Sequence, residues 1–138
     1  MSIRHQITRA AEYQSLATLR DFIVATCKGH PGVDDQVLYD LKLAVDEACT
    51  NIITHGYAGM NPGSIILEID LSPQKITMTV TDFGHAFEPC ETPMPNVEAG
   101  LEDRDTGGFG LYFIYQTMDE VDYECTEDGN HLTLVKRF

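Results

Sequence analysis

The segment that most constrains the fold is residues 41–57, which have the pattern of one amphipathic helix with a polar row beside its apolar stripe. The apolar positions recur at helical spacing; they are Val37, Leu41, Ala44, Val45, Ala48 and Ile52. Glu47, Asn51 and His55 follow one another at intervals of four residues. Such positions drift by only about 40° at each step around a helix, about 80° in total, so we expect the three side chains to share one face. A carboxylate, an amide and an imidazole in a row on a helix anchored in the core indicate a functional site.

The composition is that of one soluble globular domain, and we predict a single domain over residues 1–138. A chain of this length buries roughly two-thirds of its unfolded surface, and 43% apolar with 22% charged residues is typical of globular proteins. No apolar run reaches the ~20 residues that a membrane-spanning helix needs, and the first residues contain no apolar signal core. We therefore expect a cytoplasmic protein that does not enter a membrane.

The formal net charge of −13 bears on which partners the protein binds. Acidic side chains are dense in residues 119–124 and 127–128. Such a surface repels phosphate backbones, so direct binding of nucleic acid is not expected. A basic protein partner would be favoured, although the same charge could serve only to keep the protein in solution.

The cysteines Cys27, Cys49, Cys90 and Cys125 are far apart in the sequence and form no Cys-x-x-Cys pair. The five histidines are equally scattered. This spacing favours reduced thiols over a zinc site or a framework of disulfides.

The remaining periodicities predict strands and helices in a definite order. Strands are expected over residues 2–8, 64–71, 76–81, 121–126 and 131–138, and helices over residues 12–28, 34–56 and 111–118. Asp34 or Asp35 is expected to cap the second helix at its start, and Gly56 at its end. Neighbouring strands should pair antiparallel, with the helices covering one face. The predicted fold class is a two-layer α/β (α+β) sandwich with a mixed, mostly antiparallel sheet.

Residues 85–106 interrupt this pattern, because no period holds there and prolines recur. A long irregular segment within a compact domain is unusual, and such loops are often lids or binding loops. Gly107, Gly108 and Gly110 follow and open the next helix, where free backbone N–H groups would suit a phosphate. Arg104 could reach a terminal phosphate, or could equally be a surface residue among acidic neighbours. The glycines match neither the dinucleotide fingerprint nor the P-loop.

Four further positions carry the candidate chemistry. Glu47, on a partly buried helix, could act as a general base for a nearby hydroxyl or water. Asn51, one turn later, offers the neutral oxygen that suits Mg²⁺. Asp82 stands at a strand end, where it could accept a hydrogen bond from an amino group, and Gly84 would let a flat ligand approach the backbone. Taken singly, the Glu/Asn pair is typical of a solvated helix face, and Asp-x-Gly of an ordinary turn.

In this order and spacing, the motifs resemble the ATP-binding domain of the GHKL superfamily, which includes gyrase, Hsp90, histidine kinases and MutL. Residues 47–57 resemble its N box, residues 82–84 its adenine-binding G1 box and residues 108–111 its G2 box. Residues 102–108 are similar to the end of the lid in the small stand-alone members. Over nearly its whole length the chain resembles the anti-sigma factor serine/threonine kinases that regulate bacterial stress and sporulation responses.

The resemblance implies a Bergerat ATP-binding fold with ATP and Mg²⁺ as cofactors and a lid over about residues 85–106. Glu47 would be the general base and Asn51 would hold Mg²⁺. Asp82 would receive the adenine amino group, with Gly84 permitting the fit. The remaining implied contacts to ATP come from Arg104, Gly108, Phe109, Gly110 and Leu111. His55 also matches the family pattern, but it lies two turns from Glu47, which favours a structural role that closes the helix end against the sheet.

One position departs from the family's pattern. The family often has a Gly-Thr pair before the last strand, whose threonine helps to hold adenine, whereas this chain has Gly129, Asn130 and His131 there. Asn130 could still offer a polar contact of its own.

The leading hypothesis is therefore an ATP- and Mg²⁺-dependent serine/threonine kinase of the anti-sigma type. By resemblance, it would phosphorylate an anti-sigma-factor antagonist protein, sequester a sigma factor and form a homodimer. A second hypothesis keeps the ATP site in a non-catalytic, nucleotide-gated module that regulates a binding partner. A third is a plain α/β interaction domain whose polar helix is only solvated.

Overall fold

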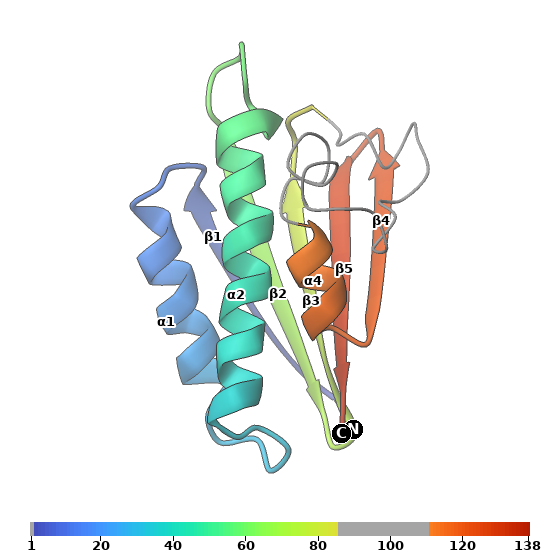
Figure 1. Cartoon of the computed structure of the whole chain (residues 1–138). Helices are drawn as coiled ribbons and strands as arrows, with labels where there is room; N and C mark the ends of the chain where they lie inside the picture. The colour runs from blue at the N-terminus through green and yellow to red at the C-terminus, as the bar shows by residue number, and fades with distance from the viewer. Residues whose placement is uncertain (1, 86–110) are drawn as a thin grey trace.

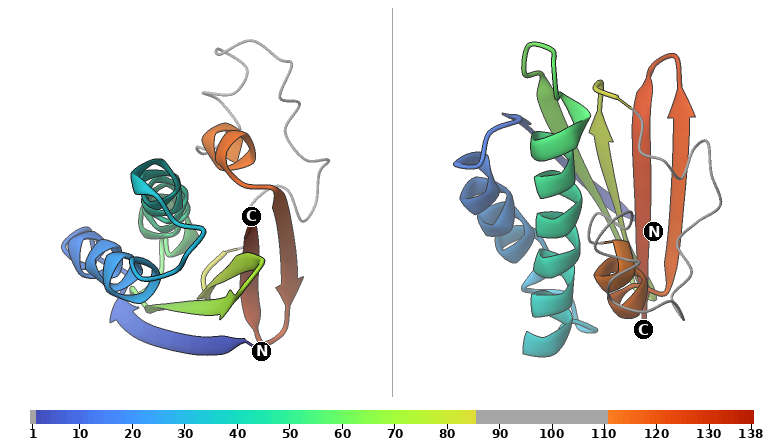
Figure 2. Two further views of the ribbon diagram at one scale, coloured as in Figure 1. Left: turned by 90° about the horizontal axis from the view of Figure 1, so that it is seen from below. Right: turned by 45° about the horizontal axis from the view of Figure 1, so that its top comes forward.

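The computed structural model describes residues 2–85 and 111–138. Its elements follow the chain as β1 (Ile3–Ala10), α1 (Ser15–Cys27), α2 (Asp35–Asn51), η1 (Ile52–Gly56), β2 (Ser64–Ser72), β3 (Lys75–Asp82), α4 (Leu111–Thr117), β4 (Glu120–Thr126) and β5 (Gly129–Arg137). The strands form one sheet, and the described helices lie together on one of its faces (Figure 1; Figure 2). The predicted two-layer α+β sandwich is thus confirmed. None of the described helices is long and apolar enough to cross a membrane.

The sheet has the strand order β1-β2-β3-β5-β4, and each pair of neighbours is antiparallel. The predicted mixed sheet is therefore replaced by a wholly antiparallel one in the described part of the chain. β4 runs in the same direction as β3, but the β4–β5 hairpin places β5 between them. No parallel pair forms there, because the two strands with the same direction are not neighbours.

The core lies between the helices and alternate residues of the central strands, as the strand period predicts. Fully buried positions on the sheet include Ile65, Leu67, Ile69, Ile76, Met78, Val80 and Leu134. Among the residues that α1 and α2 bury against them are Leu19, Ile23, Leu41, Val45 and Ala48. The same alternation buries two polar side chains, Asp82 at the end of β3 and Asn130 at the start of β5.

The central helix begins as predicted, because Asp34 caps α2 by accepting a hydrogen bond from the Val37 N–H at 2.8 Å. It does not continue as an α-helix to its expected end. After Asn51 the chain widens into the π-helix η1, in which the Tyr57 N–H donates to the Ile52 carbonyl at 3.3 Å. A π turn holds more residues than an α turn, so the regular spacing of the polar row ends at Asn51.

The π-helix corrects two predictions about the helix end. Gly56 is the last residue of η1 and Tyr57 follows as its cap, so the prediction of Gly56 as the capping residue is wrong. His55 is exposed whereas Asn51 is buried, so the two do not share one environment. Short π-helical insertions are frequent at functional sites.

The described cysteines divide into two groups, and Cys90 lies outside the described residues. Cys27 and Cys49 are buried free thiols, and burial raises the pKa of Cys27 to about 11. Cys125 on β4 is disulfide-bonded. The prediction of reduced thiols therefore holds for Cys27 and Cys49 and is wrong for Cys125.

Candidate functional site

A buried polar cluster lies at the end of the sheet where β3 ends and β5 begins. Asp82 and Asn130 are directly opposite each other on these strands and are 2% and 5% exposed. The Asp82 Oδ1 accepts hydrogen bonds from the Asn130 Nδ2 at 3.1 Å and from the Gly84 N–H at 2.9 Å. The Asn130 Nδ2 also donates to the Gly84 carbonyl at 2.9 Å. These three residues form a closed set of hydrogen bonds, which we call the Asp82 cluster.

The Asp82 carboxyl is subject to opposing influences. Burial raises its pKa, and this is the largest effect. The hydrogen bonds from Asn130 and Gly84, followed by the charge of His131, lower its pKa. N–H donors thus stabilise the carboxylate in a place from which water is largely excluded.

Two glycines let the Asp82 cluster and the end of η1 approach each other closely. A Cβ on Gly84 would overlap the Gly56 carbonyl group, which accepts a hydrogen bond from the His85 N–H. A Cβ on Gly56 would lie 3.6 Å from the Asp82 Oδ1. Position 84 therefore requires a glycine because of the helix end packed against it; its role in admitting a flat ligand stays a prediction.

Tyr57 belongs to this site, although the sequence patterns do not single it out. Its side chain is largely buried, and its hydroxyl donates to the Ser64 carbonyl at 2.8 Å and accepts from the Phe83 N–H at 3.0 Å. Tyr57 thus closes the helix end against the sheet, which is the role predicted for the exposed His55. A signal is present in the sequence, because a tyrosine just after a helix needs a partner for its hydroxyl if it is buried.

Asn51 has a buried side-chain amide whose nitrogen lacks a hydrogen-bond partner among the described residues. It is 7% exposed, and its buried Nδ2 has no hydrogen-bond partner among the described residues. The two arms of an asparagine amide are similar in shape, so turning the amide over places Oδ1 where Nδ2 lies. The site therefore fits a ligand that needs a neutral oxygen, such as Mg²⁺.

Glu47, one turn earlier on α2, is half-buried, and none of the described residues forms a hydrogen bond or ion pair with it. Its neighbour Asp46 instead pairs with Arg20 of α1 at 3.0 Å. Burial raises the pKa of Glu47, and the charge of Asp46 raises it further. A raised pKa makes a carboxylate a stronger base, so Glu47 is suited to accepting a proton.

One residue of α2, Cys49, interacts electrostatically with Asp82. Cys49 lies between Glu47 and Asn51 on α2, and its pKa is raised by burial and then by the charges of Asp46 and Asp82. α2 packs against β3 and α4. The structure thus places Glu47, Asn51 and the Asp82 cluster on elements that face one another.

The other predicted site residues cannot be placed in the same way. Arg104, Gly108, Phe109 and Gly110 lie outside the described residues, as does the predicted lid except for His85. Leu111 is the first residue of α4, which lies beside α2 (Figure 2). The roles of these residues stay predictions.

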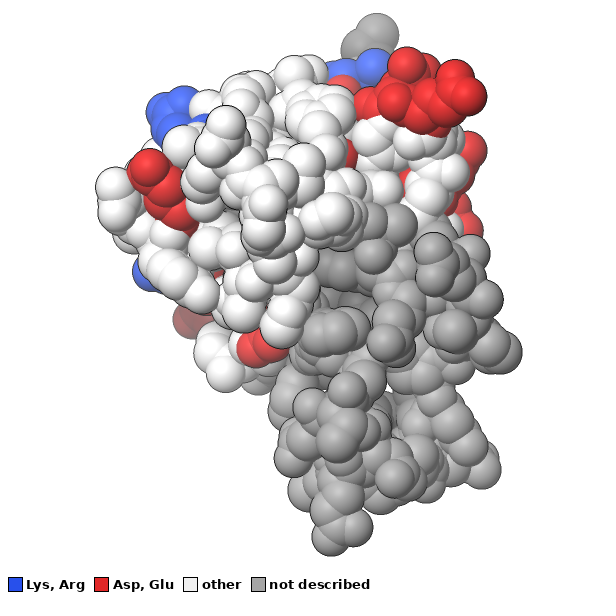
Figure 3. Space-filling view, turned by 90° about the horizontal axis from the view of Figure 1, so that it is seen from above, with Lys and Arg blue, Asp and Glu red and all other residues white. Residues whose placement is uncertain are grey.

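Figure 3 shows the end of the molecule that carries the Asp82 cluster, seen from above. The described surface there is mostly uncharged, and acidic side chains gather at its edges. A phosphate that approaches the described surface at this end would therefore meet few carboxylates, although the net charge of the chain is −13.

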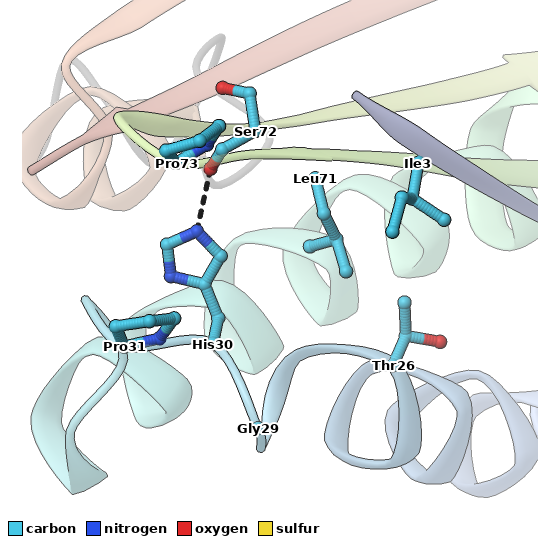
Figure 4. A pocket seen from close by; sticks show the side chains of 8 residues that line it. All are labelled: Ile3, Thr26, Gly29, His30, Pro31, Leu71, Ser72 and Pro73. Carbon is cyan, nitrogen blue, oxygen red and sulfur yellow. Dashed lines mark hydrogen bonds between the residues drawn. The ribbon is translucent and has the colours of Figure 1, made fainter. Parts of the chain in front are cut away.

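A separate pocket of about 330 Å³ lies at the opposite end of β2, and we call it the far pocket (Figure 4). It is lined by Ile3, Thr26, Gly29, His30, Pro31, Leu71, Ser72 and Pro73. The Gly32 N–H donates to the His30 Nδ1, so the His30 Nε2 carries the hydrogen that is donated to the Ser72 carbonyl at 2.6 Å. None of the predicted site residues lines this pocket.

The fold and the site together define a class of protein, a two-layer sandwich that buries an acid–amide pair at one end of its sheet, beside the end of its central helix. A family model described as the histidine kinase-like ATPase domain matches residues 9–136. The chain belongs to this family of ATPase domains.

Relatives of known name agree with this membership. The chain is 34% identical over 122 residues to a protein named serine-protein kinase RsbW from Listeria innocua, covering 84% of this chain and 74% of the relative. It is 30% identical over 96 residues to serine/threonine-protein kinase BtrW from Bordetella bronchiseptica, covering 70% and 68%. It is also 30% identical over 109 residues to an anti-sigma F factor from Clostridium botulinum, covering 78% and 75%.

Proposed function

We propose that this protein is an ATP- and Mg²⁺-dependent serine/threonine kinase that phosphorylates an anti-sigma-factor antagonist and sequesters a sigma factor. Membership of an ATPase-domain family supports the use of ATP, and the names of the relatives support kinase and anti-sigma roles. The observation that carries the proposal is the buried Asp82, whose carboxylate is held by N–H donors at the end of the sheet. A buried carboxylate of this kind suits recognition of a base amino group.

The described residues divide the work of phosphoryl transfer. Asp82 binds the adenine amino group. Asn51 would hold Mg²⁺ through its amide oxygen, and the ion would neutralise charge on the phosphates. Among the described residues, no group of three or more His, Cys, Asp and Glu side chains could hold a metal. Glu47 accepts the proton of the serine or threonine hydroxyl while the hydroxyl oxygen bonds to the γ-phosphorus and ADP leaves.

The kinase proposal is tested by incubating the protein with labelled ATP, Mg²⁺ and the antagonist encoded nearest to it in the genome. We expect labelled antagonist, and a loss of transfer by two orders of magnitude or more in Glu47→Gln, since a general base typically contributes 10²–10⁴-fold. Asp40→Asn is the matched control. Asp40 is a carboxylate on the same helix, and it accepts a hydrogen bond from the Gln36 side chain. Absence of label, or equal transfer by wild type and Glu47→Gln, would refute the catalytic role.

Partner binding is a separate element of the proposal. The net charge of −13 supports a basic docking surface on the partner and opposes direct binding of nucleic acid. We also expect a homodimer, which light scattering of the purified protein would detect. A monomer at micromolar concentration would contradict that expectation without affecting the kinase proposal.

A second candidate function is a nucleotide-gated binding module without turnover. The observation that favours it is the attachment of His85 to the helix end, through its N–H to Gly56 and its ring to Ala58. A ligand that moves the helix end would also move the start of the predicted lid. ATP binding that changes partner affinity without producing phosphorylated protein would select this function.

A further inference from the structure

Asn130 occupies the position where the chain departs from the Gly-Thr pattern, and its amide nitrogen donates to two acceptors. Its Nδ2 donates both to the Asp82 Oδ1 at 3.1 Å and to the Gly84 carbonyl at 2.9 Å. Both neighbours are acceptors, so only the NH₂ arm of the amide can face them. The orientation of the Asn130 side chain is therefore set by its partners.

The same contacts determine which oxygen of Asp82 remains for a ligand. Both donors among the described residues, Asn130 Nδ2 and Gly84 N–H, use Oδ1. Oδ2 is then the oxygen left to accept from a base. Because Gly84 is held against Gly56 and Asn130 is held by Gly84, the carboxylate cannot rotate without breaking its two hydrogen bonds to these residues.

A fixed carboxylate discriminates between purines by their substituent at position 6. Adenine presents an amino group there, which donates a hydrogen bond, whereas hypoxanthine presents an oxygen, which accepts one. A carboxylate oxygen facing this position attracts the first and repels the second. A carboxylate that rotates away no longer faces position 6. A carboxyl group that takes up a proton can donate its O–H to the 6-oxo group. Either change removes the discrimination between the two purines.

We propose that Asn130 is a positioning residue that makes Asp82 read the 6-amino group, so that selection of ATP over its 6-oxo counterpart ITP depends on Asn130. This inference rests on the proposed ATP site and adds a determinant of its specificity. The threonine usual at this position has one hydroxyl hydrogen and so could donate to only one of the two acceptors. The Asn130 amide nitrogen has two hydrogens and can donate to both the Asp82 Oδ1 and the Gly84 carbonyl.

The charge balance around Asp82 supports the same role. The hydrogen bond from Asn130 is the largest influence that lowers the pKa of Asp82 against the effect of burial. Among the described residues, the other titratable groups that interact with this carboxylate are His131 on β5, Cys49 on α2 and Tyr57 after η1. Loss of the Asn130 amide leaves the burial effect less opposed, so the carboxyl takes up a proton at higher pH.

The test measures the dissociation constants of ATP and ITP by calorimetry between pH 5 and pH 8. The proteins are wild type, Asn130→Ala, Asn130→Thr and Thr133→Ala. Thr133 lies on the same strand as Asn130, at a partly exposed position beyond Leu132, and is the matched control. We expect wild type and Thr133→Ala to prefer ATP. In Asn130→Ala the preference should fall by about tenfold or more, as expected for a lost hydrogen bond to a charged group.

The variants also differ in pH dependence. In Asn130→Ala the weakening of ATP binding on acidification should begin at higher pH than in wild type, and Asn130→Thr should fall between the two. If Asn130→Ala does not fold, as judged by circular dichroism, Asn130→Thr carries the same comparison.

Each outcome bears on a different claim. A wild type that binds neither nucleotide refutes the proposed ATP site, and this inference with it. A wild type that binds ATP and ITP equally overturns the inference and leaves nucleotide binding intact. In Asn130→Ala and Asn130→Thr, the affinities for ATP and ITP could fall equally, with unchanged preference and pH profile. That result would show a purely structural role for Asn130 and would also overturn the inference.

Discussion

The two ends of the sheet are built on different principles. At one end, Asp82 and Asn130 carry hydrogen-bonded polar groups into the core, and glycine backbones pack against each other beneath η1. At the other end, the far pocket is lined mainly by apolar side chains and prolines, with His30 as its hydrogen-bonded polar group. Close backbone contact tolerates little change in side-chain volume, whereas a roomy apolar pocket tolerates more.

The sharpest test of this difference compares two glycines. We expect Gly84→Ala to lower the free energy of unfolding by about 3 kcal/mol or more, because the new Cβ overlaps the Gly56 carbonyl group. Gly29→Ala, at the far pocket, meets nothing within 4 Å and should change stability by less than about 1 kcal/mol. Urea unfolding of both variants measures the contrast. Equal losses would show that the two ends are equally constrained.

The hydroxyl of Tyr57 provides the next largest expected effect. Tyr57→Phe removes the donor to Ser64 and the acceptor for Phe83, so we expect a loss of about 2 kcal/mol in urea unfolding. Tyr39→Phe is the control, since Tyr39 is 57% exposed on α2, and should change stability by less than about 0.5 kcal/mol. A loss in Tyr57→Phe no greater than that of the control would show that these hydrogen bonds do not hold the helix end to the sheet.

His30 tests the other end of the molecule. His30→Leu removes the hydrogen bonds with Gly32 and Ser72, and we expect a loss of about 1 kcal/mol because the ring is only partly buried. ATP affinity, measured by calorimetry, should stay unchanged, since His30 lies in the far pocket. A large change in ATP affinity would show that the two ends are energetically coupled.

The smallest expected effect on stability concerns the charge of Asp82. Its pKa is raised in the folded protein, so the native state binds this proton more tightly than the unfolded chain. Stability from this group therefore increases as the pH falls through the folded pKa, and the ionised form costs stability above it. We expect Asp82→Asn to be at least as stable as wild type at pH 7, with a difference that shrinks on acidification, and to lose ATP binding. A variant less stable than wild type at pH 7 would contradict this sign.

Much of this architecture follows from local patterns in the sequence. The alternation in residues 64–71 and 76–81 predicts two strands, each with one buried face. Both strands form there and are slightly longer than predicted. Asp34 was predictable as a cap because its carboxylate meets free N–H groups at the helix start. Asp82 and Gly84 stand out as a strand-end motif, and the structure brings them together with Asn130.

Other features depend on contacts between distant parts of the chain. The π-helix at residues 52–56 is not visible in the apolar period, and it forms where Gly56 and Tyr57 pack against the end of β3. Tyr57 and Asn130 interact with residues 26 and 48 positions away in sequence, respectively. The wholly antiparallel sheet depends on β5 entering between β3 and β4.

By itself the sequence determined the layers, the order of the elements and the chemical types that the candidate site contains, because periodicity and helix capping are local properties of the chain. Only the tertiary structure decided that Tyr57 closes the helix end, that Asn130 holds Asp82, and that the Asn51 amide nitrogen is buried without a described partner. Those outcomes depend on which side chains meet across the sheet and beneath the helix. Hydrogen bonds and burial between residues far apart in sequence settle them, and no local pattern encodes such pairs.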